Sequence, residues 1–295
     1  MCYYLWQDEV MHIYNSRLET LKTHMTTKKF QKIIWQYYQT HGREFPWRKT
    51  TDPYKILVSE TMLQQTQTER VIPKYKLWLK LFPNFKALHR APLQKVLKAW
   101  QGLGYNRRAI ALKRTAEIIM KTYDGKFPKD LSKILSLPGI GPYTASAVSV
   151  FSFNMPLPCI ETNIRTVYIH FFFKDSSRVS DKDLLRLIEQ TLDRKNPREW
   201  FYALMDYGVW LKKTGLNRNS QSKHYTKQSP FKGSNRELRA KIVRLITEKP
   251  QTFASLKKSL QVNEENIKKN LKTLEKEGFF IAARDTHGRV CYGVR

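Results

Sequence analysis

Two glutamates stand in surroundings that favour opposite protonation states. Glu60 is flanked by the apolar residues Val58 and Met62, which favour the protonated form of a carboxyl group. Glu161 comes just before a helix predicted from Asn163 to Phe171, whose partly positive N-terminus keeps a carboxylate ionised. General acid–base chemistry needs such a pair. Each glutamate also has a purely structural alternative, Glu60 at the start of its helix and Glu161 as a helix cap.

A glycine-containing turn is a second candidate site, suited to binding an anion. Leu137-Pro138-Gly139-Ile140-Gly141 lies between apolar patterns that repeat at helical intervals on both sides. Gly139 and Gly141 let the backbone approach a phosphate, and N–H groups at the start of the following helix attract an anion. This helix-hairpin-helix pattern predicts phosphate contacts that do not depend on base sequence. An ordinary turn between two helices is the alternative.

The charge of the chain points to a polyanionic partner. Of 295 residues, 53 are Lys or Arg and 25 are Asp or Glu, which gives a formal net charge of +28. Nucleic acid is the first candidate partner, an anionic membrane surface the second, and a merely basic surface the remaining alternative. No apolar run reaches the ~18 residues of a membrane span, so we expect no membrane insertion.

The cysteines argue against a metal site. Cys2, Cys159 and Cys291 lie far apart, and no two have the short spacing of a zinc or iron–sulfur site. We therefore expect no metal and no cofactor. The N-terminus does not resemble a secretory signal, and we expect a cytoplasmic protein.

Helices must position these residues, because the chain reads as helical from Lys28 to Lys213. Apolar residues repeat at helical intervals from Ser59 to Leu81, and proline and glycine mark the breaks between helices. A polar, basic stretch follows. The expected organisation is an N-terminal extension (1–24), a helical domain (25–212), a basic linker (213–233) and a smaller C-terminal domain (234–295).

The C-terminal domain has the pattern of a winged helix-turn-helix. Ser234, Thr252 and Asn263 can each cap a helix, the third helix ends at Gly278, and two β-prone runs follow as a hairpin. The third helix, the usual recognition helix of this motif, carries Lys268, Lys269, Lys272 and Lys276. DNA contact is the favoured interpretation, and docking of a protein is the alternative.

Several motifs together resemble the helix-hairpin-helix DNA glycosylases. Besides the hairpin they are Ser59–Gln67, Gly102–Tyr105 and Glu161–Val167, in the order and spacing of that superfamily. Pro46-Trp47-Arg48 and Met62–Thr66 look like the A/G-mismatch-specific adenine glycosylases, the MutY family. The resemblance implies a mainly α fold of two helical subdomains. It also implies a monofunctional adenine DNA glycosylase of base excision repair, a monomer associated with the nucleoid, whose partner is double-stranded DNA with adenine opposite guanine or 8-oxoguanine.

The resemblance implies catalytic-site roles for four residues, which are Glu60, Glu161, Asn163 and Tyr143. Glu60 falls where the family keeps the acid that protonates N7 of adenine and later activates water. Glu161 stands where the family has an aspartate that stabilises the cationic sugar, so its side chain is one methylene longer. Tyr143 replaces the lysine with which bifunctional members form a Schiff base, so we expect base hydrolysis without strand cleavage.

The resemblance also implies DNA contacts. Gln65 and Tyr105 hold positions that enter the duplex near the base opposite the target, and Arg48 and Asp206 hold positions that read the adenine edge. We expect Leu63 and Met62 to belong to the helix core rather than to a wedge. With the two hairpin glycines, the predicted DNA-binding residues are Gln65, Tyr105, Gly139, Gly141, Arg48 and Asp206.

Two departures from the family pattern leave alternatives open. Most members hold a four-cysteine iron–sulfur cluster after the Asp206 segment, where this chain has Lys212-Lys213-Thr214. The chain therefore resembles a clusterless branch, and the basic run 212–227 either contacts phosphates or is a flexible linker. A winged helix stands where the family usually has a Nudix-like domain. The alternatives are a thymine or uracil mismatch glycosylase of the same fold and an inactive DNA-binding protein.

Overall fold

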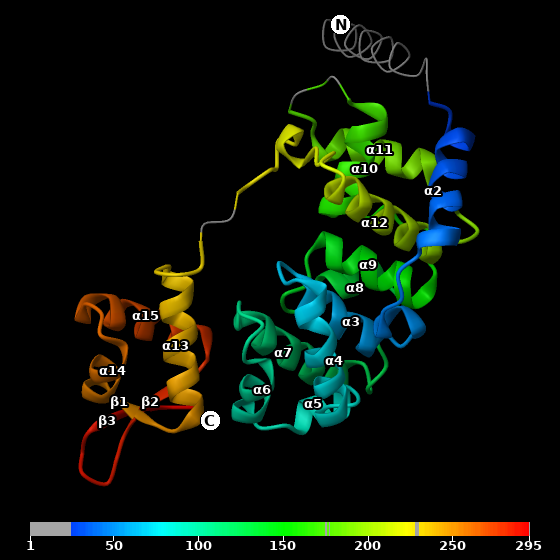
Figure 1. Ribbon diagram of the computed structural model, residues 1–295. Coiled ribbons are helices and arrows are strands. Elements are labelled where there is room, and N and C mark those ends of the chain that lie inside the picture. Colours follow the sequence, from blue (N-terminus) through cyan, green and yellow to red (C-terminus); the bar gives the residue numbers. More distant parts are fainter. Residues whose placement is uncertain (1–24, 175, 177, 228–229, 295) are drawn as a thin grey trace, which may run out of the picture. The chain divides into compact units, whose positions relative to one another are not determined.

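The computed structural model describes residues 25–174, 176, 178–227 and 230–294, so the predicted extension over residues 1–24 lies outside the described residues. Helices make up most of it (Figure 1), which confirms the mainly α class. The chain forms two compact units, each built from two separate segments. One unit combines the residues up to Glu44 with Ser149–Lys227, and the other combines Phe45–Val148 with the chain beyond Lys227.

The first unit has an aromatic core between helices that are distant in sequence. Its helices are α2 (Thr27–His41), the second half of α9 (Pro142–Phe153), α10 (Thr162–Phe172), α11 (Asp181–Thr191) and α12 (Pro197–Lys213). Phe30 of α2 meets Tyr168 and Trp200 edge-on, with ring centroids 5.3 and 5.7 Å apart. α12 packs against both α2 and α10 (Figure 1).

The second unit holds the helices around the hairpin. They are η1 (Pro46–Lys49), α3 (Pro53–Leu63), α4 (Thr68–Leu81), α5 (Phe85–Arg90), α6 (Leu93–Trp100), α7 (Arg107–Thr122), α8 (Leu131–Leu135) and the start of α9. Trp78 and Trp100 form its core at a centroid distance of 5.4 Å. The helical periodicity from Ser59 to Leu81 is interrupted between α3 and α4, where Gln65 has φ +53°. Hydrophobic spacing does not reveal this break, because both helices bury apolar residues.

Helix α3 is buried almost all round, which places Glu60 inside the unit. The Asp52 side chain caps the helix by accepting from Tyr54 N at 2.9 Å, and Pro53 follows at the first helical position. Met62 is fully buried, so the prediction that it belongs to the core is confirmed, whereas Leu63 at the end of the helix is partly exposed. Glu60 lies in the last turn of α3, so the alternative that places it at the helix start is wrong.

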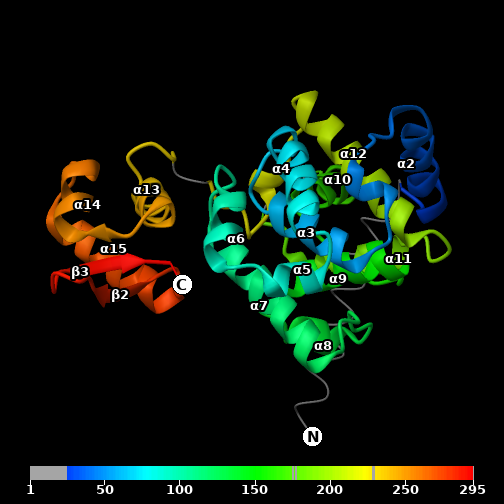
Figure 2. The same cartoon turned by 90° about the horizontal axis from the view of Figure 1, so that it is seen from below.

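The C-terminal part of the second unit forms the predicted three helices and wing. Its elements are α13 (Asn235–Glu248), β1 (Gln251–Thr252), α14 (Phe253–Leu260), α15 (Glu264–Glu277), β2 (Ile281–Arg284) and β3 (Val290–Gly293). Ser234, Thr252 and Asn263 cap their helices as expected, and Gly278 ends α15 in the left-handed conformation. β3 pairs antiparallel with β2 (Figure 2). On its other side β3 pairs antiparallel with the unpredicted β1. β1 was not predicted, because a strand of two residues is too short to show the alternating pattern of a strand.

In the described residues, none of the helices combines the length and apolar character that a membrane span requires.

Candidate active site and nucleic-acid interface

The buried carboxyl of Glu60 contacts the tyrosine that follows the hairpin. Glu60 is 7% exposed, and its Oε2 accepts a hydrogen bond from the hydroxyl of Tyr143 at 2.9 Å. Tyr143 belongs to the first turn of α9, directly after Gly141. Burial and the negative end of the α3 dipole both disfavour an anion at Glu60. The hydrogen bond from Tyr143 holds the carboxyl group of Glu60 in one orientation.

Glu161 caps helix α10, and the cap fixes its carboxylate. Oε1 accepts from the backbone N–H groups of Asn163 and Ile164 at 2.7 and 2.9 Å. Oε2 accepts from the Asn163 side-chain amide and from the Thr162 hydroxyl, both at 3.1 Å. The structural alternative, in which Glu161 is a helix cap, therefore agrees with the observed contacts. The same contacts hold the carboxylate in place. These four hydrogen bonds fix both oxygens of the Glu161 side chain at the start of α10.

Two residues of α12 contact Asn163 from the other side. Lys212 Nζ donates to Asn163 Oδ1 at 2.7 Å and to the Thr162 hydroxyl at 3.3 Å. One turn earlier, a Cβ on Gly208 would lie 2.4 Å from the backbone oxygen of Asn163. Burial lowers the pKa of Lys212, and nearby Arg165 adds to this effect while Glu161 opposes it.

Asp206 binds Arg43, a residue that no motif indicated. The Asp206 side chain is 1% exposed, Oδ2 accepts from the Arg43 backbone N–H at 2.8 Å, and Oδ1 accepts from its guanidinium at 2.7 and 2.8 Å. The carboxylate thus anchors the end of α2 to α12. The predicted contact of Asp206 with adenine stays a prediction, and this geometry favours an effect transmitted through Arg43.

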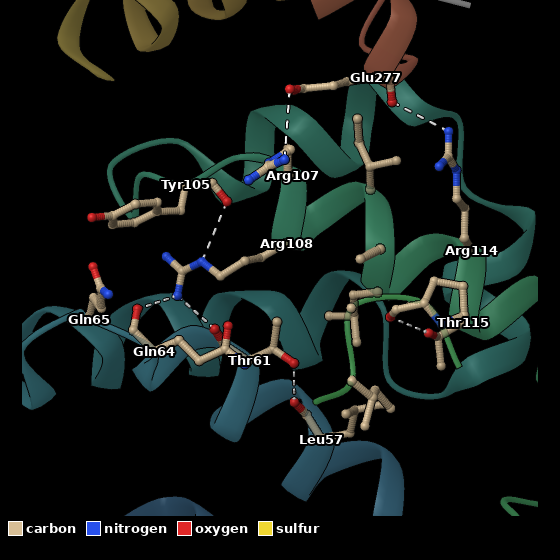
Figure 3. A pocket seen from close by; sticks show the side chains of 16 residues that line it. Leu57, Thr61, Gln64, Gln65, Tyr105, Arg107, Arg108, Arg114, Thr115 and Glu277 are labelled. Atoms are coloured by element: carbon tan, nitrogen blue, oxygen red, sulfur yellow. Dashed lines mark hydrogen bonds and ion pairs between the residues drawn. The ribbon is translucent and has the colours of Figure 1, made fainter. Parts of the chain in front are cut away.

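A single guanidinium holds together the two loops that carry Gln65 and Tyr105 (Figure 3). Arg108 Nη1 donates to the carbonyls of Thr61, Met62 and Gln64, and Nη2 donates to those of Leu103 and Gly104, at 2.7 to 3.1 Å. The first three belong to the end of α3, where carbonyls lack helical partners. Burial lowers the pKa of Arg108 to about 10.

The two loops present exposed residues in the left-handed conformation. Gln65 and Tyr105 have φ values of +53° and +46°, and Tyr105 is 41% exposed. Arg108 lies 5.5 Å from the centroid of the Tyr105 ring, in cation–π contact. Because a bulky residue at positive φ is strained, the surrounding contacts must hold this conformation. Arg108 supplies many of them.

The hairpin lines the same cavity as these loops. A cavity of about 490 Å³ is bordered by Gln65, Tyr105 and Gly139, among other residues. Gly139 has φ +74°, and an added Cβ would lie 2.6 Å from the Cβ of Ala111. At Gly141 the space is open. The structure thus brings three of the six predicted DNA-binding residues to one hollow, with Gly141 two residues beyond.

Arg48 takes part in a different contact. It belongs to η1, and its guanidinium lies 5.1 Å from the centroid of the Phe45 ring. Its predicted DNA contact stays a prediction.

The residues present do not fit a four-cysteine cluster. The sequence has three cysteines in all, and within the described residues no three His, Cys, Asp or Glu side chains gather as a metal site would require. Cys159 is buried in the first unit, whereas Cys291 belongs to β3 of the second.

Comparison with known proteins places these features in a family. Residues 58–192 match the model of the HhH-GPD superfamily base excision DNA repair proteins. A thymine/uracil-DNA glycosylase of Methanothermobacter thermautotrophicus is 30% identical over 190 residues, which are 63% of this chain and 86% of that protein. The chain belongs to the HhH-GPD superfamily of base excision DNA repair proteins.

Relatives within the HhH-GPD superfamily confirm the resemblance to adenine glycosylases. An adenine DNA glycosylase of Buchnera aphidicola subsp. Baizongia pistaciae is 38% identical over 192 residues, 63% of this chain and 54% of that protein. The chain spans about half the length of the adenine DNA glycosylases it matches. A solved thermostable thymine-DNA glycosylase is 28% identical with a TM-score of 0.56, covering 62% of this chain and 86% of that one.

Sequence reasoning missed the contacts of three basic residues. Arg43, Arg108 and Lys212 each contact a predicted site residue, as described above. In a chain with 53 basic residues, none of the three stands out by type or spacing. The position of Arg108 shortly after Gly102–Tyr105 was the single available signal.

Proposed function

We propose that the protein is a monofunctional adenine DNA glycosylase that binds duplex DNA and removes adenine mispaired with guanine or 8-oxoguanine. The motifs around Glu60 and the 38% identity to an adenine DNA glycosylase support this proposal. The net charge of +28 suits a nucleic-acid partner.

In the proposed reaction the bond between adenine N9 and the sugar C1′ breaks, and both electrons leave with the base. Glu60 gives its proton to N7 of adenine, so the base departs as a neutral molecule. Glu161 stabilises the positive charge that develops on the sugar. Glu60, now a carboxylate, takes a proton from the water molecule whose oxygen bonds to C1′, which restores the acid.

The hydrogen bond between Tyr143 and the buried Glu60 carries the proposal. It places a phenol against the candidate acid, at the position where bifunctional relatives have a lysine amine. A phenol cannot form a Schiff base, and its hydrogen bond orients the carboxyl group. This pair of side chains therefore supports hydrolysis by an activated water.

Single-turnover assays on a panel of mismatched duplexes test the proposal. Adenine should be released from duplexes with guanine or 8-oxoguanine opposite, without strand scission until alkali is added. Glu60→Gln keeps the shape of the side chain but has no transferable proton. Its single-turnover rate should be at least about a thousandfold lower, which raises the activation barrier by some 4 kcal/mol. Its duplex affinity should change by less than about tenfold. Glu69→Gln, at an exposed position of α4, is the matched control.

A near wild-type rate for folded Glu60→Gln would show that another group is the acid. Mismatch binding by the wild-type protein without release of any base would support an inactive binding protein instead.

A thymine or uracil mismatch glycosylase is the second candidate. The chain covers 86% of the thymine/uracil-DNA glycosylase of Methanothermobacter thermautotrophicus, whereas it covers 54% of the adenine DNA glycosylase of Buchnera aphidicola subsp. Baizongia pistaciae. The same panel separates the two, because the released base is identified directly.

We also propose that the enzyme works without an iron–sulfur cluster. The segment after α12 is held by other contacts: Val179 and Ser222 form a parallel bridge, and Arg218 donates to the carbonyl of Lys174 at 3.1 Å. Purified protein should have no visible absorption band of a cluster and should retain base release after treatment with a chelator.

A further inference from the structure

We propose that Lys212 is a positioning residue: its ammonium group sets the orientation of the Asn163 amide and thereby the place of the Glu161 carboxylate. This inference rests on the proposed function. It gives Lys212, which the sequence placed at the start of the basic run 212–227, a role that differs from phosphate contact.

The hydrogen bonds run in one direction, from Lys212 to Glu161. An ammonium group has donors and no acceptor, so the amide of Asn163 must turn its oxygen toward Lys212. The NH₂ end of the same amide then faces Glu161 Oε2 and donates to it at 3.1 Å. The Thr162 hydroxyl repeats this pattern, accepting from Lys212 at 3.3 Å and donating to Oε2 at 3.1 Å.

Both oxygens of Glu161 are therefore fixed, by different means. Backbone N–H groups hold Oε1, and they would do so with any side chain at position 212. The side chains that hold Oε2 depend on Lys212 for their orientation. If Lys212 is removed, no donor holds the oxygen end of the Asn163 amide, so the amide can turn away from Oε2 and its hydrogen bond to Glu161 is made less often.

Helix α12 is shaped to bring Lys212 to this place. Gly208 precedes it by one helical turn, on the same face, and lets α12 approach the backbone of Asn163 closely. Lys212 is half-buried, and burying an ammonium group is unfavourable unless it is paired. Its partners at the start of α10 and the charge of Glu161 provide that pairing. Lys212 also begins the segment where most family members have the cluster.

The experiment compares Lys212→Met, Lys212→Arg and Lys182→Met in the full-length protein, with adenine opposite 8-oxoguanine in the duplex. Lys182 is an exposed residue of α11 and serves as the control. Lys212→Met should slow single-turnover release about 10- to 100-fold, with less than about threefold change in the duplex Kd, as expected for loss of a group that orients a catalytic residue. Lys212→Arg should recover most of the rate.

The pH profile distinguishes positioning from a general loss of packing. The charged groups that influence Lys212 are Glu161 and Arg165, both at the start of α10, and burial lowers the Lys212 pKa. As the pH rises, the wild-type and Lys182→Met proteins should lose rate together when Lys212 loses its proton. Loss of the Glu60 proton affects all of these proteins alike. Compared with Lys212→Arg at the same pH, the wild-type and Lys182→Met proteins should therefore lose additional rate, because a guanidinium stays charged.

Hydrogen exchange of the Asn163 side-chain amide gives a readout that does not require activity. We expect faster exchange in Lys212→Met than in Lys182→Met, with the signal assigned by its loss in Asn163→Asp. A wild-type protein that releases no base would refute the proposed function, while this exchange would still test the inference. Equal exchange and equal rates in the two methionine variants would overturn it. So would a borohydride-trapped adduct that Lys212→Met abolishes, since Lys212 would then be a nucleophile.

Discussion

Gly208 allows α12 to lie directly against the start of α10, and alanine at this position should disturb the candidate site. The added Cβ would lie 2.4 Å from the Asn163 carbonyl oxygen, 2.7 Å from its carbonyl carbon and 2.8 Å from its Cβ. Two of these atoms belong to the backbone, so no side-chain rotation relieves the overlap. An ordinary contact of 3.4 Å requires the two helices to separate by about 1 Å at this point.

Two opposing effects determine the change in stability. Alanine favours a helix interior over glycine by about 1 kcal/mol. Overpacking in a close contact destabilises by about 1–3 kcal/mol. The net loss in the free energy of unfolding should therefore be at most about 2 kcal/mol, and Gly208→Ala should fold. The effect on chemistry is larger, because a shift of about 1 Å at a catalytic group lowers the rate roughly a hundredfold.

Thermal unfolding and single-turnover adenine release, measured on Gly208→Ala and on the exposed control Lys182→Ala, test this reasoning. We expect a drop in Tm of a few degrees at most and a rate about a hundredfold lower than that of the control. If Gly208→Ala melts at or above the wild-type temperature and releases adenine at the control rate, α10 and α12 do not require the close contact. The inferred link between helix packing and the Glu161 carboxylate would then be wrong.

Three further predictions concern the other contacts. Arg108→Ala leaves several buried carbonyls without a donor and should lower the free energy of unfolding by about 2–4 kcal/mol in chemical unfolding. Arg108→Lys has fewer donors and should recover part of this loss. Equal stability of the wild type and both variants would show that Arg108 does not hold the two loops together. Glu161→Gln should be nearly as slow as Glu60→Gln in single-turnover release, while Glu161→Asp should keep substantial activity. A fully active Glu161→Gln would show that the charge of this residue is not needed for the reaction. Duplex affinity should fall steeply with salt, with a log–log slope of magnitude at least about 4, and a slope near zero would be incompatible with binding through phosphates.

Local sequence was sufficient wherever a few neighbouring residues decide the structure. Ser234, Thr252 and Asn263 cap their helices as predicted, because a cap depends on one side chain and on backbone N–H groups two or three residues ahead. Glu161 caps α10 for the same reason. The family also followed from sequence, since its motifs are short and their spacing is preserved.

Tertiary structure decided the contacts that hold the site in place. Arg43 and Asp206 lie 163 positions apart, Lys212 and Asn163 lie 49 apart, and Arg108 reaches back 44 positions to Gln64. In a chain this rich in Lys and Arg, the local sequence does not distinguish a basic side chain that binds a carboxylate or several carbonyls from one that faces solvent. The sequence by itself indicated which residues have side chains suited to the proposed removal of a base. The packing of α12 on α10 and of α7 on α3 determined which basic residues contact the candidate site residues. These contacts join helices that are distant in sequence, so the local sequence does not show them.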